Sequence, residues 1–288
     1  MRNRSLGPVV VTEEILVKES RPIDYKAPPG WGEDALSNFQ SISIENEFAT
    51  FVNASSWYKA LSAIAADLTK CSDYAIANIR QADDPSALLL FIAAHNQFLA
   101  SACLATSGQC LPAYPTARAA IESALYGWYL AGTSGAAQRW HDKPTDRAKL
   151  KKWNDEFKFS ALRSELSKTS RDAAEWAKYL HQTSIDFGAH PNKEALYSNM
   201  AHKRCADGGG ILQMTFLHTW RALSVSTTKF VIETGMFSVS LFARTFPEAE
   251  RSYGLMAAAA GHATTLRALV AETAQFIEND MELSSEGQ

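Results

Sequence analysis

Arg118 and Glu122 are the two residues whose types and spacing most suggest chemistry. They stand four positions apart in an otherwise apolar segment, so on a helix both side chains project from one face. A buried ion pair is costly unless further groups partner it. One interpretation is therefore a structural ion pair that bridges helices. The other is a pocket in which Arg118 grips an anion while Glu122 holds a base or a metal.

A second candidate is the segment 186–192, which reads Asp-Phe-Gly-Ala-His-Pro-Asn. A residue before proline avoids helical angles, so we expect His190 to be extended or in a turn, and the segment to be non-helical. An imidazole titrates near neutral pH, which makes His190 a candidate acid or base, with Asp186 beside it and Asn192 as a binding group. The alternative is a turn in which Asp186 and Asn192 satisfy local backbone groups and His190 packs as a hydrogen-bonded plug.

His95 is a third candidate, for binding rather than catalysis. It lies midway along a largely apolar segment, beside Asn96 and Gln97. The alternative is a core histidine whose ring nitrogens are satisfied inside the protein.

The stretch 139–163 is the most basic part of the chain. It holds eight Lys and Arg against four Asp and Glu, with Trp140, Trp153 and Phe157 interleaved. Such a stretch can meet RNA or an acidic partner. The alternative is a solvated helix face with ion pairs one turn apart.

Several familiar sites are absent from the sequence. No histidine follows a Glu by three positions, no His-Glu-x-x-His motif occurs, and no cysteines have zinc-finger spacing. The phosphate-binding loop, the dinucleotide fingerprint and the Gly-x-Ser-x-Gly elbow are missing too. We therefore predict no metal ligands and no cofactor.

Composition and charge set the broad class. The 288 residues are 46% hydrophobic and 20% charged, which excludes wholesale disorder, and the net charge of −3 excludes a global basic field. The longest apolar run, residues 87–94, is too short for a membrane span. The four cysteines form no Cys-x-x-Cys pair, so we expect buried reduced thiols. Together these features predict a cytoplasmic protein that does not cross a membrane.

The elements that must position the candidate residues are helices. Periodicity predicts helices over residues 56–80, 84–106, 115–131 and 171–183, followed by two long helical stretches over 212–244 and 246–281. The second and third are apolar on nearly every side, so we expect them to form a central antiparallel hairpin. Residues 205–210 read as a loop or hairpin tip. We predict an all-α fold, a single irregular helical bundle over residues 41–288, with residues 1–40 as an extended N-terminal arm that includes a short strand at 9–17.

The Arg-x-x-x-Glu helix that follows an apolar helix, with the Gly-Ala-His-Pro turn downstream, resembles a group of uncharacterised bacterial all-helical proteins. Some of these are thought to be related to helical domains of toxin–antitoxin and phage-defence systems, which include nucleotide-binding and RNase-like members. The resemblance covers about residues 85–200 and implies a polar centre near Arg118, Glu122 and His190. The RNase-like members carry Arg, then four to six residues, then His, and this spacing precedes none of the seven histidines.

The missing catalytic motifs favour a noncatalytic binding or interaction module with a protein or a small molecule as ligand, and the resemblance implies a role in a defence or stress response. The alternative is a hydrolase or nuclease that uses His190 as acid or base and Arg118 with Glu122 at the site. A third hypothesis is a structural subunit whose aromatic-rich surface docks a partner.

Overall fold

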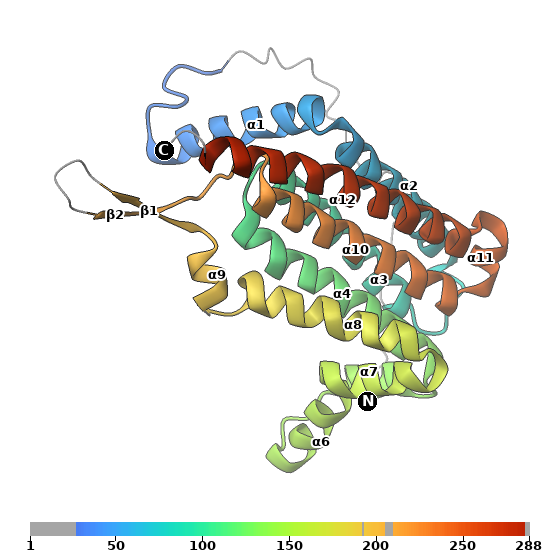
Figure 1. Ribbon diagram of the computed structural model, residues 1–288. Coiled ribbons are helices and arrows are strands. Elements are labelled where there is room, and N and C mark those ends of the chain that lie inside the picture. Colours follow the sequence, from blue (N-terminus) through green and yellow to red (C-terminus); the bar gives the residue numbers. More distant parts are fainter. Residues whose placement is uncertain (1–26, 192, 205–209, 286–288) are drawn as a thin grey trace.

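The computed structural model describes residues 27–191, 193–204 and 210–285 (Figure 1). Across these ranges every regular element is helical except one antiparallel hairpin, which confirms the predicted all-α fold. The elements in chain order are α1 (Ala35–Asn53), α2 (Ser55–Asn78), α3 (Ser86–Thr106), α4 (Cys110–Gly132), α5 (Ala136–His141), α6 (Arg147–Phe157), α7 (Phe159–Thr169), α8 (Arg171–Ser184), the π-helical turn η1 (Ile185–Ala189), α9 (Lys193–Tyr197), β1 (Met200–Arg204), β2 (Gly210–Met214), α10 (Ala222–Thr245), α11 (Pro247–Tyr253) and α12 (Leu255–Ser285).

The core is built on α3, α4 and α10. The first two pack along their length as the predicted hairpin, and α10 packs against both (Figure 1). Their facing side chains are fully buried, among them Phe98, Ile121 and Phe237. The next layer comprises α2, α8 and α12, while α5 to α7 extend from one end and the β1–β2 hairpin projects from another. Helix α10 is buried on nearly every side, whereas α3 keeps an exposed strip that includes Leu89 and Cys103.

Helix α10 is rich in Ser and Thr and yet lies in the core, because most of its buried hydroxyl groups are satisfied within the helix itself. Thr228, Thr234 and Ser238 are fully buried, and each hydroxyl donates to the carbonyl four residues earlier, at 2.8–3.0 Å. This local bond satisfies the hydroxyl without a partner on another helix. The segment therefore packs as an apolar helix would.

One helix, α3, is long and apolar enough to cross a membrane by length and composition. In the structure it packs against α2, α4 and α10. A core helix meets the same criterion, and 39% of the apolar window of α3 is buried against the rest of the described chain.

The N-terminal boundary differs from the prediction. Helix α1 begins at Ala35, inside the range expected to be an extended arm, because the Asp34 carboxylate caps it by accepting from the amides of Leu36 and Ser37. The preceding residues 27–34 form turns. Residues 1–26, including the strand predicted at 9–17, lie outside the described residues.

Three other predicted boundaries were wrong. Helix α4 begins at Cys110 rather than near Pro115. Pro112 lies in its first turn, where amides have no intrahelical partner, and Pro115 lies inside the helix, where it removes one backbone hydrogen bond. The stretch 246–281 is two helices, broken where Gly254 adopts a left-handed φ of 61°. The stretch 212–244 begins as strand β2 and becomes helical at Ala222. The loop expected at 205–210 joins two paired strands, and its residues 205–209 lie outside the described part of the chain.

Gly235 of α10 tests the close packing of the core. A Cβ at this position would lie 2.5 Å from Ile64 Cγ2 and 2.6 Å from the Phe98 ring, so Gly235→Ala must push α10 away from α2 and α3. We expect a loss of about 1–3 kcal/mol in the free energy of unfolding, measured by urea denaturation.

The matched control is Gly261→Ala in α12, where a Cβ would meet open space. Alanine there should stabilise the helix by about 0.5–1 kcal/mol through its higher propensity. Equal effects of the two substitutions would contradict the close approach at Gly235.

Candidate functional site

Arg118 and Glu122 form an ion pair on the face of α4 that meets α8. Arg118 Nε donates to Glu122 Oε1 at 2.7 Å. The side chains are 23% and 36% exposed, so the pair lies at the edge of the core rather than sealed among apolar groups. Partial contact with water lowers the desolvation cost that a fully buried pair would pay. The pair is therefore within reach of a ligand.

His190 joins this pair from a distant part of the chain. Its Nε2 lies 3.2 Å from Arg118 Nη1, although 72 positions separate the two residues. A guanidinium can only donate, so Nε2 is the acceptor in this contact. The structure thus brings together three of the residues that sequence analysis selected.

His181 of α8 is a fourth member, and the sequence analysis missed it. Its Nε2 lies 3.4 Å from Glu122 Oε1, but this contact lacks the alignment of a hydrogen bond, and no described residue accepts from that nitrogen. The ring stacks on Phe159 with centroids 3.7 Å apart. The only signal in the sequence was its position on the amphipathic helix that leads directly to His190.

The electrostatics favour an ionised Glu122. Burial raises the pKa of this carboxyl, but His181 and Arg118 act in the opposite sense and together outweigh it, so the net pKa is lowered. The cluster of Arg118, Glu122, His181 and His190, called here the Arg118 cluster, therefore holds a carboxylate and a guanidinium beside two imidazoles.

The turn η1 sets the position of His190. We predicted a non-helical segment here. Helix α8 instead continues into a π-helical turn over Ile185–Ala189, but Gly188 within it has non-helical angles (φ 174°, ψ −22°) and His190 is extended, with φ −135° and ψ 148°, so the prediction holds at Gly188 and His190. The reason for the π-helical turn is its close approach to α4. A Cβ on Gly188 would lie 2.5 Å from the carbonyl oxygen of Leu111. Phe187 also stacks on Tyr114 of α4, with ring centroids 5.5 Å apart. The extended conformation predicted for His190 is confirmed.

An open pocket of about 480 Å³ borders the Arg118 cluster at His190. Its other lining residues are Leu111, Gly188, Pro191, Ala195 and Leu196. The imidazole is thus the polar edge of a mostly apolar hollow. A ligand with an apolar body and an acceptor group could lie in this hollow and reach the imidazole.

The remaining candidates lie apart from the cluster or outside the described structure. Asp186 accepts from Gln182 Nε2 at 2.8 Å, one turn back, and no described contact joins it to His190. His95 is 4% exposed and shares a 2.8 Å hydrogen bond between its Nδ1 and Ser72 Oγ. Burial lowers the pKa of His95, as expected of a core imidazole, but its Nε2 is buried without a hydrogen bond to any described residue, so only one ring nitrogen is satisfied. Asn192 lies outside the described residues.

Two further polar clusters join distant segments. His141 Nε2 lies 2.9 Å from Ser86 Oγ and 3.1 Å from Asp84 Oδ2. A catalytic triad needs the serine and the carboxylate on opposite ring nitrogens, whereas here both use Nε2, so this group is not arranged as a triad.

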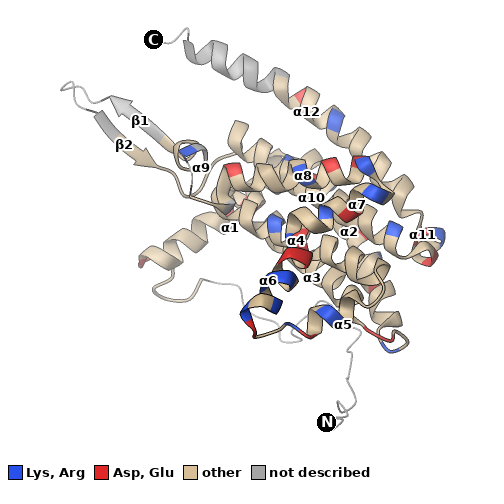
Figure 2. Ribbon diagram, turned by 90° about the horizontal axis from the view of Figure 1, so that it is seen from below, with Lys and Arg blue, Asp and Glu red and all other residues tan. Residues whose placement is uncertain are grey.

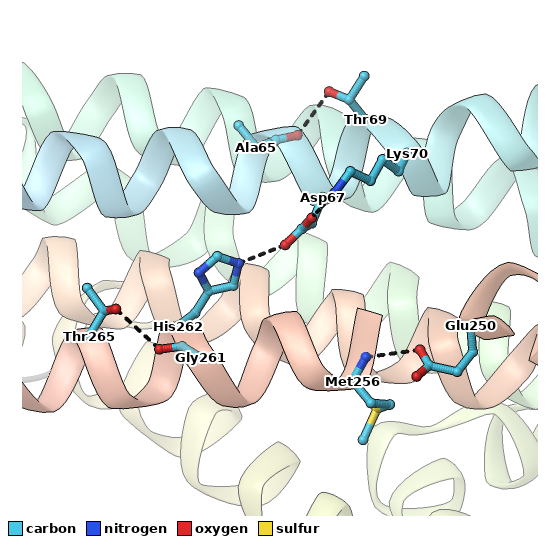
Figure 3. Close-up of polar contacts among 9 residues, drawn as sticks. All are labelled: Ala65, Asp67, Thr69, Lys70, Glu250, Met256, Gly261, His262 and Thr265. Atoms are coloured by element: carbon cyan, nitrogen blue, oxygen red, sulfur yellow. Dashed lines mark hydrogen bonds and ion pairs between the residues drawn. The ribbon is translucent and has the colours of Figure 1, made fainter. Parts of the chain in front are cut away.

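The second of these clusters lies between α2 and α12 (Figure 3). The buried Asp67 carboxylate holds Lys70 Nζ and His262 Nε2, each at 2.7 Å. Asp67 is therefore the bridging group between the second helix and the last.

The basic stretch 139–163 lies over α5 to α7 at one end of the molecule (Figure 2). Arg139 pairs with Glu156, Lys158 with Asp155, and Arg163 with Glu175. Four exposed cations of α6, namely Arg147, Lys149, Lys151 and Lys152, have no ion pair among the described residues. RNA binding by this stretch stays a prediction, and these four side chains are the ones available for it.

Known proteins offer no guide to the chemistry of these clusters. In the described ranges no group of three or more His, Cys, Asp and Glu side chains is placed to hold a metal ion. Comparisons with family models, with curated proteins and with solved structures find no match to this chain. Any functional conclusion therefore rests on the geometry.

The lowered pKa of Glu122 makes a testable prediction. The Glu122 carboxyl binds a proton more readily in the unfolded state than in the folded state. Ionised Glu122 therefore stabilises the fold at pH values above its pKa in the unfolded state, and this stabilisation is lost as the pH falls through its lower pKa in the folded state. Glu122→Gln should lower the free energy of unfolding at pH 7 by no more than about 1 kcal/mol, since the 36% exposed side chain is screened by water. The difference from wild type should shrink between about pH 5 and about pH 3 in urea denaturation.

The control is Glu165→Gln on α7, which removes an exposed surface pair with Lys168. We expect little effect at any pH, because exposed pairs contribute little. A difference between Glu122→Gln and wild type that stays constant with pH would contradict the assigned role of the carboxylate.

Proposed function

We propose that this protein is a noncatalytic binding module that holds an anionic group of its ligand at the Arg118 cluster. The observation that carries this proposal is the 3.2 Å contact between Arg118 and His190 at the edge of an open pocket. Carboxylate and phosphate oxygens accept strong hydrogen bonds from a guanidinium and from an imidazole N–H.

The bonding of the cluster favours binding over catalysis. The lone pair on His190 Nε2, which a general base would use, already accepts from Arg118. Glu122 is engaged by Arg118 and lies beside His181. Among the described contacts of these four residues there is no hydroxyl or thiol to act as a nucleophile. The resting arrangement therefore offers donors for a ligand but no ready reactive group.

The pocket beside His190 suggests the shape of the ligand. Its lining is apolar except for the imidazole, so it fits an apolar group next to the anionic one. A small organic anion or an acidic side chain of a protein partner has this form. A role in a bacterial defence or stress response follows only from the resemblance over residues 85–200.

A second candidate is a hydrolase or nuclease, and one observation favours it. Two imidazoles lie in one cluster: His190 contacts the Arg118 guanidinium, and His181 lies beside the Glu122 carboxylate. A phosphate that drew the Arg118 guanidinium toward itself would free His190 Nε2 to take a proton from an attacking hydroxyl.

We also propose a cytoplasmic location. Cys71, Cys103 and Cys110 are free thiols in the structure, as a reducing compartment would maintain them. Cys71 and Cys110 are buried as predicted, whereas Cys103 is exposed. Cys205 lies outside the described residues.

Anion binding is tested by titrating the protein with pyrophosphate and following the histidine ring signals by NMR. Wild type should show saturable shifts of His190 and His181. Arg118→Gln should weaken binding about tenfold or more, because it removes a charged donor worth about 1.5–3 kcal/mol.

Arg163→Gln is the matched control, because Arg163 also pairs with a glutamate but lies on α7. It should bind as wild type does. Equal affinity of the Arg118 and Arg163 variants, or no shift in wild type, would refute the site.

Cleavage of a labelled single-stranded RNA decides between the two functions. We expect equal, background cleavage by wild type and by His190→Ala. If wild type cleaves the RNA and His190→Ala binds it without cleaving it, the binding-module proposal is wrong and the nuclease proposal is supported.

A further inference from the structure

A groove on another face of the bundle shares no residue with the Arg118 cluster. It has a volume of about 360 Å³ and lies where α10 packs against α8 and α12. Its apolar walls include Trp176 of α8, Met236 of α10, and Leu266 and Val270 of α12. Trp176 is held in place edge-on against Phe237, with ring centroids 5.5 Å apart. The groove is thus a firm apolar surface on three helices.

One carboxylate oxygen in this groove has no partner. Glu233 lines the groove, and its side chain is only 16% exposed. Its Oε1 accepts from Lys229 Nζ at 2.7 Å, whereas its Oε2 is buried without a hydrogen bond to any described residue. A buried acceptor left unpaired is costly, and such groups in native proteins call for an explanation. A ligand donor in the groove supplies one.

The charges around Glu233 restrict what that donor can be. Burial lowers the pKa of Lys229, but Glu233 and Tyr179 outweigh it and the net pKa is raised, so Lys229 remains an ammonium that already neutralises the carboxylate. A second cation beside it would be repelled, so a neutral N–H or O–H fits better. The exposed Arg267 on α12 lines the groove from another helix and adds a positive charge that suits an anionic group.

We propose that this groove binds a small apolar molecule that carries a neutral N–H or O–H donor for Glu233 Oε2 and an anionic group for Arg267. The apolar body lies against Trp176, Met236 and Leu266. Indole-3-acetate is a probe with these three features, because it combines a planar apolar ring, a ring N–H and a carboxylate.

Calorimetric titration with three probes tests the proposal. Indole-3-acetate should bind saturably, and Arg118→Gln, which removes the anion donor of the other proposed site, should not weaken the binding at this groove. 1-Methylindole-3-acetate, which lacks the donor, should bind about tenfold more weakly, as loss of one hydrogen bond to a charged acceptor predicts. Indole, which lacks the carboxylate, should also bind more weakly than indole-3-acetate. No binding of indole-3-acetate at millimolar concentration, or equal affinity for the methylated probe, would overturn the proposal.

Variants locate the site. Arg267→Gln should weaken binding of indole-3-acetate about tenfold while leaving the affinity for indole unchanged. Arg251→Gln on α11, which alters another exposed arginine, is the control and should change neither. Ala263→Phe should fill the groove and abolish binding, whereas Ala260→Phe, at an exposed position one turn earlier, should retain it. Binding that survives Ala263→Phe in a protein with an unchanged melting temperature would place the site elsewhere and refute the proposal.

Discussion

The enclosure of α3, α4 and α10 is the constraint on which the rest of the structure depends. Each of these helices carries apolar side chains around most of its circumference, so each needs neighbours on several sides, although α3 leaves Leu89 and Cys103 exposed. The outer helices α2, α8 and α12 meet this need by packing against them. Close approaches such as that at Gly235 leave no room for the layers to shift. The Arg118 cluster and the groove at Glu233 both lie where the outer helices leave part of α4 or α10 uncovered.

Polar groups at those edges connect segments that are far apart in the sequence. His190 reaches Arg118 across 72 positions, and His262 reaches Asp67 across 195. Most of these groups are partly exposed, which lets them keep some hydration while they fix the relative positions of helices. The same partial exposure makes the Arg118 cluster accessible to a ligand. The contribution of the cluster to stability and the binding proposed for it thus depend on the same partial exposure.

The sequence predicted those features that depend on local pattern. The apolar residues of α3 and α4 predicted the central hairpin, and the four-residue spacing of Arg118 and Glu122 predicted their shared face. The proline after His190 predicted its extended backbone. Features that depend on contacts between distant segments were not predictable in this way. The π-helical turn arises from the approach of Gly188 to Leu111, and the place of His181 depends on stacking with Phe159.

The contacts between α2 and α12 bear on how the protein can be made. Besides the Asp67–His262 pair, Trp57 Nε1 donates to Thr273 Oγ1 at 3.1 Å, across 216 positions. Asp67 leaves the ribosome 195 residues before His262, so the face of α2 that carries Asp67 and Trp57 lacks its partner until α12 has been synthesised. The contacts of α2 with α12 can therefore form only after α12 has emerged, and until then the nascent chain exposes an incomplete core.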